Sequence, residues 1–153
     1  MRGYTHLAAG IAAAALIPGL TLSTGAGIIV GSILPDVDKS TSMIGRRVPI
    51  LPKLLKHRGV THSLLMAGLL FPLNTGLSLG CAIHLVLDMS NPEGVRLLWP
   101  IPVSFRIPVL SRFMRSGKFW DKLLGGLLWT LDTVLIALMV LGMNPYTLIF
   151  GIG

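Results

Sequence analysis

The chain has 153 residues, of which 52% are hydrophobic and only 12% are charged, and its mean hydropathy is +0.76. Soluble domains carry about 25% charged residues, so this composition argues against an ordinary soluble domain and predicts an all-α integral membrane protein. The net charge of +7 would suit nucleic-acid binding in a soluble protein, but here the basic residues fall between apolar blocks, so we expect no nucleic-acid partner.

The first apolar block covers residues 7–34 and is broken by Pro18-Gly19. Its beginning, MRGYTHLAAGIAAAALIPGL, also fits a secretory signal peptide, but no A-x-A cleavage site follows and a second apolar run begins almost at once. We therefore expect a retained helix that turns back at the proline and glycine to form a hairpin.

The second apolar block covers residues 63–87 and is broken by FPLNTG at 71–76, which predicts a second hairpin. The arms of both hairpins are shorter than the roughly 20 residues that one crossing needs, so tilt or partial insertion is implied. The chain has a single cysteine, Cys81, in this second block. One cysteine excludes an internal disulfide, and we expect Cys81 to be a small core residue.

The third block, residues 123–143, is free of proline and predicts one transmembrane helix, which also offers a surface for oligomerisation. Asp132 lies near its middle and is expected to face the bundle, towards Thr130 or Thr133, or a partner chain. The fold prediction is thus two short helical hairpins followed by one C-terminal transmembrane helix, in a single domain over residues 1–153.

Two polar segments, 39–60 and 89–122, connect the blocks and carry most of the Lys and Arg residues. Paired hairpins place both segments on one side of the membrane, as the positive-inside rule requires of cytoplasmic loops. This predicts a multi-pass protein of the inner (cytoplasmic) membrane. We expect residues 103–122 to lie on the lipid surface through basic and aromatic side chains; the alternative is that this segment collects an anionic substrate.

All four histidines and three of the six acids stand at the ends of the first two blocks. If each block is a hairpin, these ends meet at one face of the membrane. His84 and Asp88 are four residues apart and share a helix face, whereas Asp36 and Asp38 follow Pro35 and are expected to leave their helix and turn inward. The sequence therefore predicts a cytoplasm-facing metal site whose candidate ligands are His6, Asp36, Asp38, His62, His84 and Asp88.

Imidazole and carboxylate ligands suit zinc, with manganese or iron as alternatives, and one cysteine is too few for a thiolate site. The paired acids favour two ions with a bridging aspartate over a single ion.

The stretch HRGVTHS at 57–63 is the other dense group of polar residues. Gly59 is expected to let the backbone turn and Thr61 to cap the following helix. Arg58 suits a phosphate or carboxylate group, and His57 is either a further ligand or an acid–base catalyst. Glu93 is a candidate ligand or general base, although its surroundings also read as a plain turn.

Four ordered features, namely an N-terminal histidine, LPDVD, HRGVTHS and HLVLDMSNPEGVRLLWP, resemble the YdjM-type family of membrane-bound metal-dependent hydrolases, some of them LexA-regulated. The resemblance runs from about residue 3 to residue 102. The spacing His84-x-x-x-Asp88 is also similar to one in zinc-dependent phospholipase C and P1-type nucleases.

The resemblance and the site together predict a hydrolase in which His57, Arg58 and Glu93 assist catalysis beside the metal. A site at the bilayer surface implies membrane lipid as its partner and a lipid-linked phosphate or ester as its substrate, for example a phospholipid or an isoprenoid phosphate. The alternative is a non-catalytic membrane protein with a structural or regulatory metal, or a metal transporter.

Overall fold

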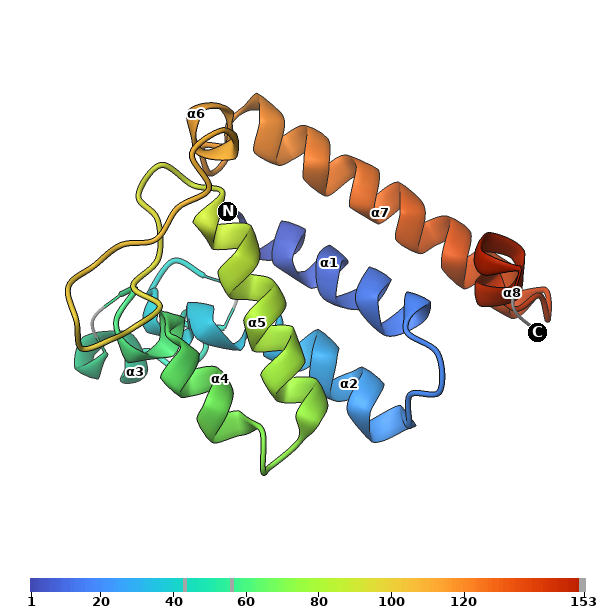
Figure 1. The fold of residues 1–153 in the computed structure, drawn as a ribbon, viewed down its shortest axis with the longest axis horizontal. Helices are drawn as coiled ribbons and strands as arrows, with labels where there is room; N and C mark the ends of the chain where they lie inside the picture. Colours follow the sequence, from blue (N-terminus) through green and yellow to red (C-terminus); the bar gives the residue numbers. More distant parts are fainter. Residues whose placement is uncertain (43, 56, 152–153) are drawn as a thin grey trace.

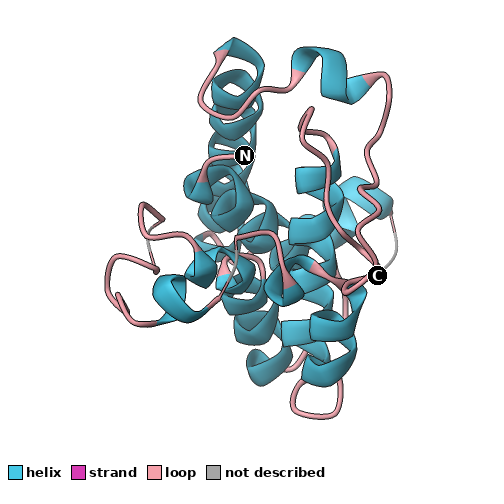
Figure 2. Ribbon diagram, turned by 90° about the vertical axis from the view of Figure 1, so that its left-hand side faces the viewer, coloured by secondary structure: helices cyan, strands magenta, loops and turns pink. Residues whose placement is uncertain are grey.

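The computed structural model describes residues 1–42, 44–55 and 57–151 (Figure 1). Lys56, one of the basic residues predicted in the first polar segment, and the last two residues of the predicted domain lie outside these ranges. The described residues form helices joined by loops, with no strand (Figure 2), and one isolated antiparallel bridge pairs Val95 with Phe105. The helices are α1 (Gly3–Leu16), α2 (Leu22–Gly31), α3 (Leu51–Leu54), α4 (Leu64–Leu70), α5 (Thr75–Met89), α6 (Leu110–Phe113), α7 (Phe119–Val140) and α8 (Pro145–Phe150), with the short 3₁₀ helices η1 (Leu34–Asp38) and η2 (Val60–His62).

Both predicted breaks separate a pair of helices. The chain turns between α1 and α2 with Gly19 at a φ of 69°, and the Thr21 hydroxyl caps α2 by accepting from the Thr24 N–H. The second turn separates α4 from α5, where the Asn74 side chain accepts from the Leu77 N–H. Because each turn supplies a cap for the returning helix, the second arm starts at a defined residue.

Helices α2 and α5 come unusually close because glycines face the contact from both sides. A Cβ on Gly31 would lie 2.3 Å from the Leu77 carbonyl oxygen, and a Cβ on Gly80 would lie 2.2 Å from the Ile28 carbonyl oxygen. Only residues without a side chain allow this approach. Cys81 is fully buried beside them, which confirms that it is a small core residue.

The longest helix, α7, has 22 residues and lies along α1 in Figure 1. It begins at Phe119, four residues before the predicted start at 123, so the end of the predicted interfacial segment belongs to it. By length and composition it is the one described helix that is long and apolar enough to cross a bilayer. At 1.5 Å per residue it extends about 33 Å, close to the thickness of the hydrocarbon core.

Asp132 lies on the inner side of α7 and is only 1% exposed. It faces the bundle as expected, but it does not contact Thr130 or Thr133 through a hydrogen bond, because the two hydroxyls donate to the carbonyl oxygens of Gly126 and Trp129 in the preceding turn. Within the described ranges neither carboxylate oxygen of Asp132 has a hydrogen-bond partner.

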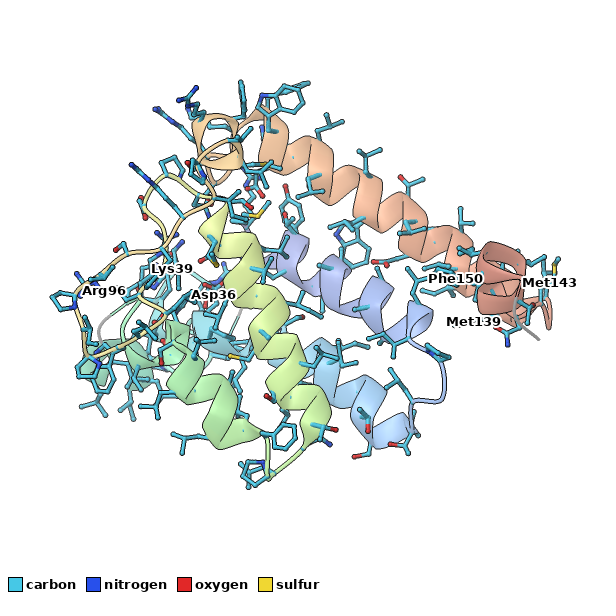
Figure 3. The ribbon with its side chains drawn as sticks, viewed as in Figure 1. Asp36, Lys39, Arg96, Met139, Met143 and Phe150 are labelled. Carbon is cyan, nitrogen blue, oxygen red and sulfur yellow. The ribbon has the colours of Figure 1, made fainter. Side chains whose placement is uncertain are left out.

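The two ends of the bundle differ in chemistry. Figure 3 shows Asp36, Lys39 and Arg96 together at one end, and Met139, Met143 and Phe150 at the other. The N-terminus of α1 and the C-terminus of α5 both reach the first end, along with η1 and η2. We call this the polar end of the bundle, and it is where the predicted site residues meet.

Candidate metal centre

Four short stretches of backbone bring the predicted ligands together at the polar end. His6 comes from α1, Asp36 and Asp38 from η1, His62 from η2, and both His84 and Asp88 from α5. The side chains of His6, His62 and His84 are 0% exposed. The aspartates leave the α-helix as expected, because Pro35 opens a tight 3₁₀ turn that buries both of them.

The inner part of the cluster consists of His6, Asp36, His62, His84 and Asp88. His62 Nε2 lies 3.3 Å from His84 Nε2, 3.7 Å from Asp88 Oδ2 and 3.9 Å from Asp36 Oδ1. His84 Nε2 lies 3.9 Å from Asp88 Oδ2. For a tetrahedral zinc ion with bonds of about 2.0–2.1 Å, neighbouring ligand atoms are about 3.3 Å apart, so these separations are of the size that one ion would close.

Hydrogen bonds fix the protons of two of these rings. His84 Nδ1 lies 2.7 Å from the Ser32 carbonyl oxygen, which only accepts, so Nδ1 carries the proton and Nε2 presents a lone pair. His62 Nδ1 lies 3.1 Å from Asp38 Oδ2, so in the neutral ring Nδ1 carries the proton and Nε2 presents a lone pair. The two lone pairs face each other, an arrangement that a cation between them stabilises.

His6 completes this face of the cluster. Its ring stacks on that of His84, with centroids 3.8 Å apart and an angle of 16° between the planes. Neither of its ring nitrogens has a partner of hydrogen-bonding geometry in the described chain, although Nε2 lies 3.3 Å from Asp88 Oδ1. A buried imidazole without a partner is costly, and coordination of an ion would satisfy it.

Asp88 is the carboxylate with the most cationic surroundings. Its Oδ1 accepts from the Met1 ammonium at 2.6 Å and from the Asn91 side chain at 2.9 Å. Its Oδ2 faces His62 and His84 and lies 3.5 Å from Arg58 Nη2. One oxygen of Asp88 is thus held by donors while the other points into the cluster.

Asp38 occupies a different position from the other predicted ligands. Its Oδ1 lies 2.7 Å from His57 Nδ1, and its Oδ2 accepts from the Thr61 hydroxyl, from the Arg58 N–H at 3.1 Å and from His62 Nδ1. Burial raises the pKa of Asp38, but the hydrogen bonds from His57 and His62 outweigh burial and hold that pKa well below its usual range. This carboxylate therefore orients the His62 ring, and with His57 and His62 it also forms an outer group of candidate metal ligands.

Of the two expectations for the stretch at 57–63, the turn at Gly59 is confirmed and the cap at Thr61 is wrong. Gly59 bends the backbone with a φ of −88° and a ψ of −131°, and Arg58 before it adds a left-handed φ of 59°. The cap of α4 is Ser63, whose hydroxyl accepts from the Met66 N–H, while Thr61 donates to Asp38 instead. A non-glycine residue in the left-handed region costs free energy, and such residues gather at functional sites.

The predicted catalytic residues stand at the rim of the cluster. Arg58 Nη1 lies 2.7 Å from Glu93 Oε2 and 3.1 Å from the Gly94 carbonyl oxygen, and its Nη2 points to Asp88. The Glu93 side chain is 79% exposed and that of His57 is 38% exposed. A small pocket of about 90 Å³ reaches the carboxylates from outside and is lined by Met1, Asp36, Lys39, His57, Arg58, Asp88, Glu93 and Ser116.

Some residues that shape the site carried no signal in the sequence. The Ser32 carbonyl orients His84, and Asn91 holds one oxygen of Asp88. Asp121, the acid in the first turn of α7, is 0% exposed and accepts from the N–H groups of Arg2 and Gly117 and from the Thr5 hydroxyl. An acid at a helix N-terminus is a recognisable signal, but two of its three partners, Arg2 and Thr5, are 119 and 116 residues away in the sequence.

The sequence of this chain matches a family of membrane proteins and several of its relatives. The sequence model of the YdjM inner membrane protein family matches residues 1–151. The uncharacterized protein YvsG of Bacillus subtilis is 37% identical over 144 residues, which cover 80% of this chain and 86% of YvsG. The inner membrane protein YdjM of Escherichia coli is 36% identical over 101 residues, covering 54% of this chain and 52% of YdjM, and YdjM of Shigella flexneri matches equally. No solved structure matches the chain.

Proposed function

The chain belongs to the YdjM inner membrane protein family, and from this premise we propose that it is a membrane-bound hydrolase. It holds one divalent ion in the inner cluster and cleaves a lipid-linked phosphate or ester. The observation that carries the proposal is the facing pair of buried imidazoles, His62 and His84, within reach of two carboxylates that border a pocket.

The donor set fits a divalent ion. Two imidazoles are already oriented with their lone pairs inward, His6 has unpartnered nitrogens, and Asp36 and Asp88 supply anionic oxygens. Nitrogen and carboxylate donors at these separations favour zinc, with manganese or iron as alternatives. The inner cluster contains two groups of candidate ligands, and His84 belongs to both; the first adds His6 and Asp36, and the second adds His62 and Asp88. Because one imidazole nitrogen binds one ion, we favour a single ion over the two ions that the adjacent aspartates suggested.

When bound, such an ion lowers the pKa of water and polarises a phosphoryl or carbonyl oxygen. The protein's own residues supply the rest. Asp38 fixes the His57 ring through Nδ1, which leaves Nε2 at the pocket to take or return a proton. Arg58 points a guanidinium into the same pocket, where it would neutralise charge that develops on a substrate oxygen. Glu93 holds Arg58 in that position from the exposed side.

An inner-membrane location is supported by the names of the relatives and by α7. The exposed surface of this helix is apolar, with Leu127, Val134 and Val140 at 61%, 51% and 80% exposure. Lipid is the solvent that such a surface requires. At 14 and 15 residues, α1 and α5 extend about 21–23 Å, short of a core about 30 Å thick, so we propose that the two hairpins enter the membrane beside α7 without crossing it.

The charges orient the molecule. All 13 Lys and Arg residues lie at Arg2, in 39–58 and in 96–122, whereas residues 3–38, 59–95 and 123–153 carry none. The hairpin turns and the end of α7 are therefore free of basic residues. By the positive-inside rule, the polar end with the cluster faces the cytoplasm.

The test is metal analysis of the purified protein together with hydrolysis of lipid phosphates and phospholipids, with and without chelator. We expect near-stoichiometric metal and turnover that chelation abolishes and metal restores. Metal-loaded protein that hydrolyses no lipid, and that unfolds on chelation, would instead show a structural metal, because structural sites are closed by protein ligands.

A further inference from the structure

A second and larger pocket opens next to the cluster, and three of its seven lining residues are basic. Its volume is about 370 Å³, and its lining includes Arg58, Glu93, Arg115, Ser116 and Lys118. Three of these residues are cationic and one is anionic, which leaves an excess of positive charge. Glu93 is already paired with Arg58 at 2.7 Å, so the exposed Arg115 and Lys118 face the pocket without that compensation.

The basic pocket is continuous with the entrance to the cluster. Arg58, Glu93 and Ser116 line both this pocket and the small pocket that reaches Asp36 and Asp88. Through its Nη2, Arg58 also reaches Asp88, at 3.5 Å from Oδ2. An anion in the basic pocket would therefore lie beside the carboxylates that we assign to the metal.

The same stretch of chain carries an apolar pocket. Leu110, Phe113, Met114 and Trp120 line a pocket of about 270 Å³, and Met114 directly precedes Arg115 in the sequence. The rings of Phe113 and Trp120 meet edge to face, with their centroids 6.3 Å apart, and both side chains are exposed. A basic and an apolar pocket on adjoining residues match a ligand with an anionic head and a hydrocarbon tail.

The segment is held in place at Gly117, between Arg115 and Lys118. The Gly117 N–H donates to Asp121 Oδ2 at 2.6 Å, and the same oxygen accepts from the Arg2 N–H at 3.2 Å. A Cβ on Gly117 would lie 3.1 Å from Arg2 Nε, and its φ of 75° suits glycine. Arg115 and Lys118 are thus anchored to the start of α1 near the cluster, which a loosely attached surface loop would not require.

We propose that residues 110–120 form the substrate-binding segment. Arg115 and Lys118, with Arg58, bind the phosphate of a lipid phosphate, and Phe113 and Trp120 contact the first carbons of its chain. This inference rests on the proposed function and deepens it, because it selects a phosphate-headed lipid over a neutral ester. Of the two alternatives for residues 103–122, it selects the binding of an anionic substrate over attachment to the lipid surface alone.

The experiment measures lipid binding to the metal-loaded, full-length protein by native mass spectrometry in detergent. The probes are dioleoyl phosphatidic acid, dioleoylglycerol and inorganic phosphate. We expect the double variant Arg115→Ala/Lys118→Ala to weaken phosphatidic acid binding about tenfold or more, because charge-assisted hydrogen bonds are lost. Dioleoylglycerol should be unaffected by that variant.

The matched control is Arg106→Ala/Arg112→Ala, which removes the same charge from two exposed residues outside the pocket, one just before the segment and one within it. It should stay within about twofold of the parent in phosphatidic acid binding. The exchange Arg115→Lys/Lys118→Arg retains the charge and should retain most of the affinity. Equal weakening by the control variant would overturn the proposal, since it would show only a general attraction to positive charge.

The variant Phe113→Ala/Trp120→Ala distinguishes a lipid phosphate from free inorganic phosphate as the ligand. Loss of phosphatidic acid binding with unchanged inorganic phosphate binding indicates a lipid ligand, whereas unchanged binding of both overturns the apolar half of the proposal. If phosphatidic acid binds through Arg115 and Lys118 but is never hydrolysed, the proposed hydrolase activity is wrong and the proposed binding segment stands. If Arg115→Ala/Lys118→Ala hydrolyses phosphatidic acid with the parent's apparent affinity, the binding segment is wrong and the hydrolase activity stands.

Discussion

His62 and His84 point their Nε2 atoms at each other across 3.3 Å, while the Nδ1 atom of each ring donates to an oxygen of the protein. Neither ring can rotate away without breaking its Nδ1 hydrogen bond inside a buried site, where an unpaired polar group is costly. The fold therefore holds two lone pairs together before any ion arrives. This preorganisation makes the cluster a candidate metal centre. It also predicts which substitutions should lower metal affinity.

Replacing either facing imidazole should remove the metal. We expect His62→Ala and His84→Ala to lower bound metal at least about tenfold, because each deletes a nitrogen ligand from a site with few alternatives. Bound metal is measured by elemental mass spectrometry after dialysis against a weak chelator. His57→Ala is the control, since its Nδ1 faces Asp38 and its ring lies outside the inner cluster; wild-type metal in His62→Ala would contradict the assignment.

The two aspartates of η1 should behave differently. Asp38→Asn removes the carboxylate that orients His62, and outer carboxylates of this kind change metal affinity about 10–100-fold. Asp36→Asn instead removes a direct ligand and should cost at least as much affinity, while leaving His57 and His62 in place. Competition with a fluorescent zinc chelator measures both constants. A full metal affinity in Asp38→Asn would show that orientation of His62 by this carboxylate is unimportant.

The broad arrangement follows from periodicity and composition. Breakers at Pro18-Gly19 and 71–76 predict where the chain reverses, and two reversals return His6, Asp36, His62 and Asp88 to one end. The unbroken third block predicts α7 to within a few residues. These features are local or follow from simple counting of turns, which is why the sequence alone predicts them.

The finer geometry depends on contacts between distant residues. Nothing in the sequence distinguishes Asp38 from Asp36, because their roles differ only in which carboxylate faces Thr61 and the Arg58 N–H. The left-handed backbone at Arg58 is held by that same carboxylate, so the turn extends one residue beyond the glycine that predicted it. The Ser32 carbonyl that orients His84 has no signature of its own, since every residue carries a carbonyl.

Close packing of α2 on α5 should control the site from a distance. Gly80→Ala would place a Cβ 2.2 Å from the Ile28 carbonyl oxygen and 2.7 Å from the Ser32 nitrogen, so the helices must separate. His84 lies one turn further along α5 and would lose its hydrogen bond to Ser32. We expect lower metal affinity and a lower Tm, measured by chelator competition and by thermal denaturation in detergent. Gly68→Ala is the control, because nothing lies within 4 Å of its added Cβ; metal affinity should stay unchanged and the Tm should not fall.

Membrane topology gives a further prediction. Cysteines introduced at the exposed positions Lys53 and Arg106 should react with an impermeant maleimide only from the cytoplasmic side, whereas one at Met143, beyond the end of α7, should react from the opposite side. The native Cys81 is fully buried and serves as an unreactive background. Labelling of Lys53→Cys and Arg106→Cys from opposite sides would rule out paired hairpins that enter from one face.

The two buried acids of α7 should have opposite effects on stability. Asp121 accepts from Arg2, Gly117 and Thr5, so Asp121→Ala leaves three donors unsatisfied and should lower the free energy of unfolding by about 2–4 kcal/mol. Asp132 is buried without a hydrogen-bond partner in the described chain, so Asp132→Leu removes an uncompensated polar group and should raise the Tm. Thermal denaturation of both variants in the same detergent measures the contrast. A fall in Tm for Asp132→Leu as large as that for Asp121→Ala would mean that Asp132 has a stabilising partner, an ion or another chain, and would make it a second polar site of this protein.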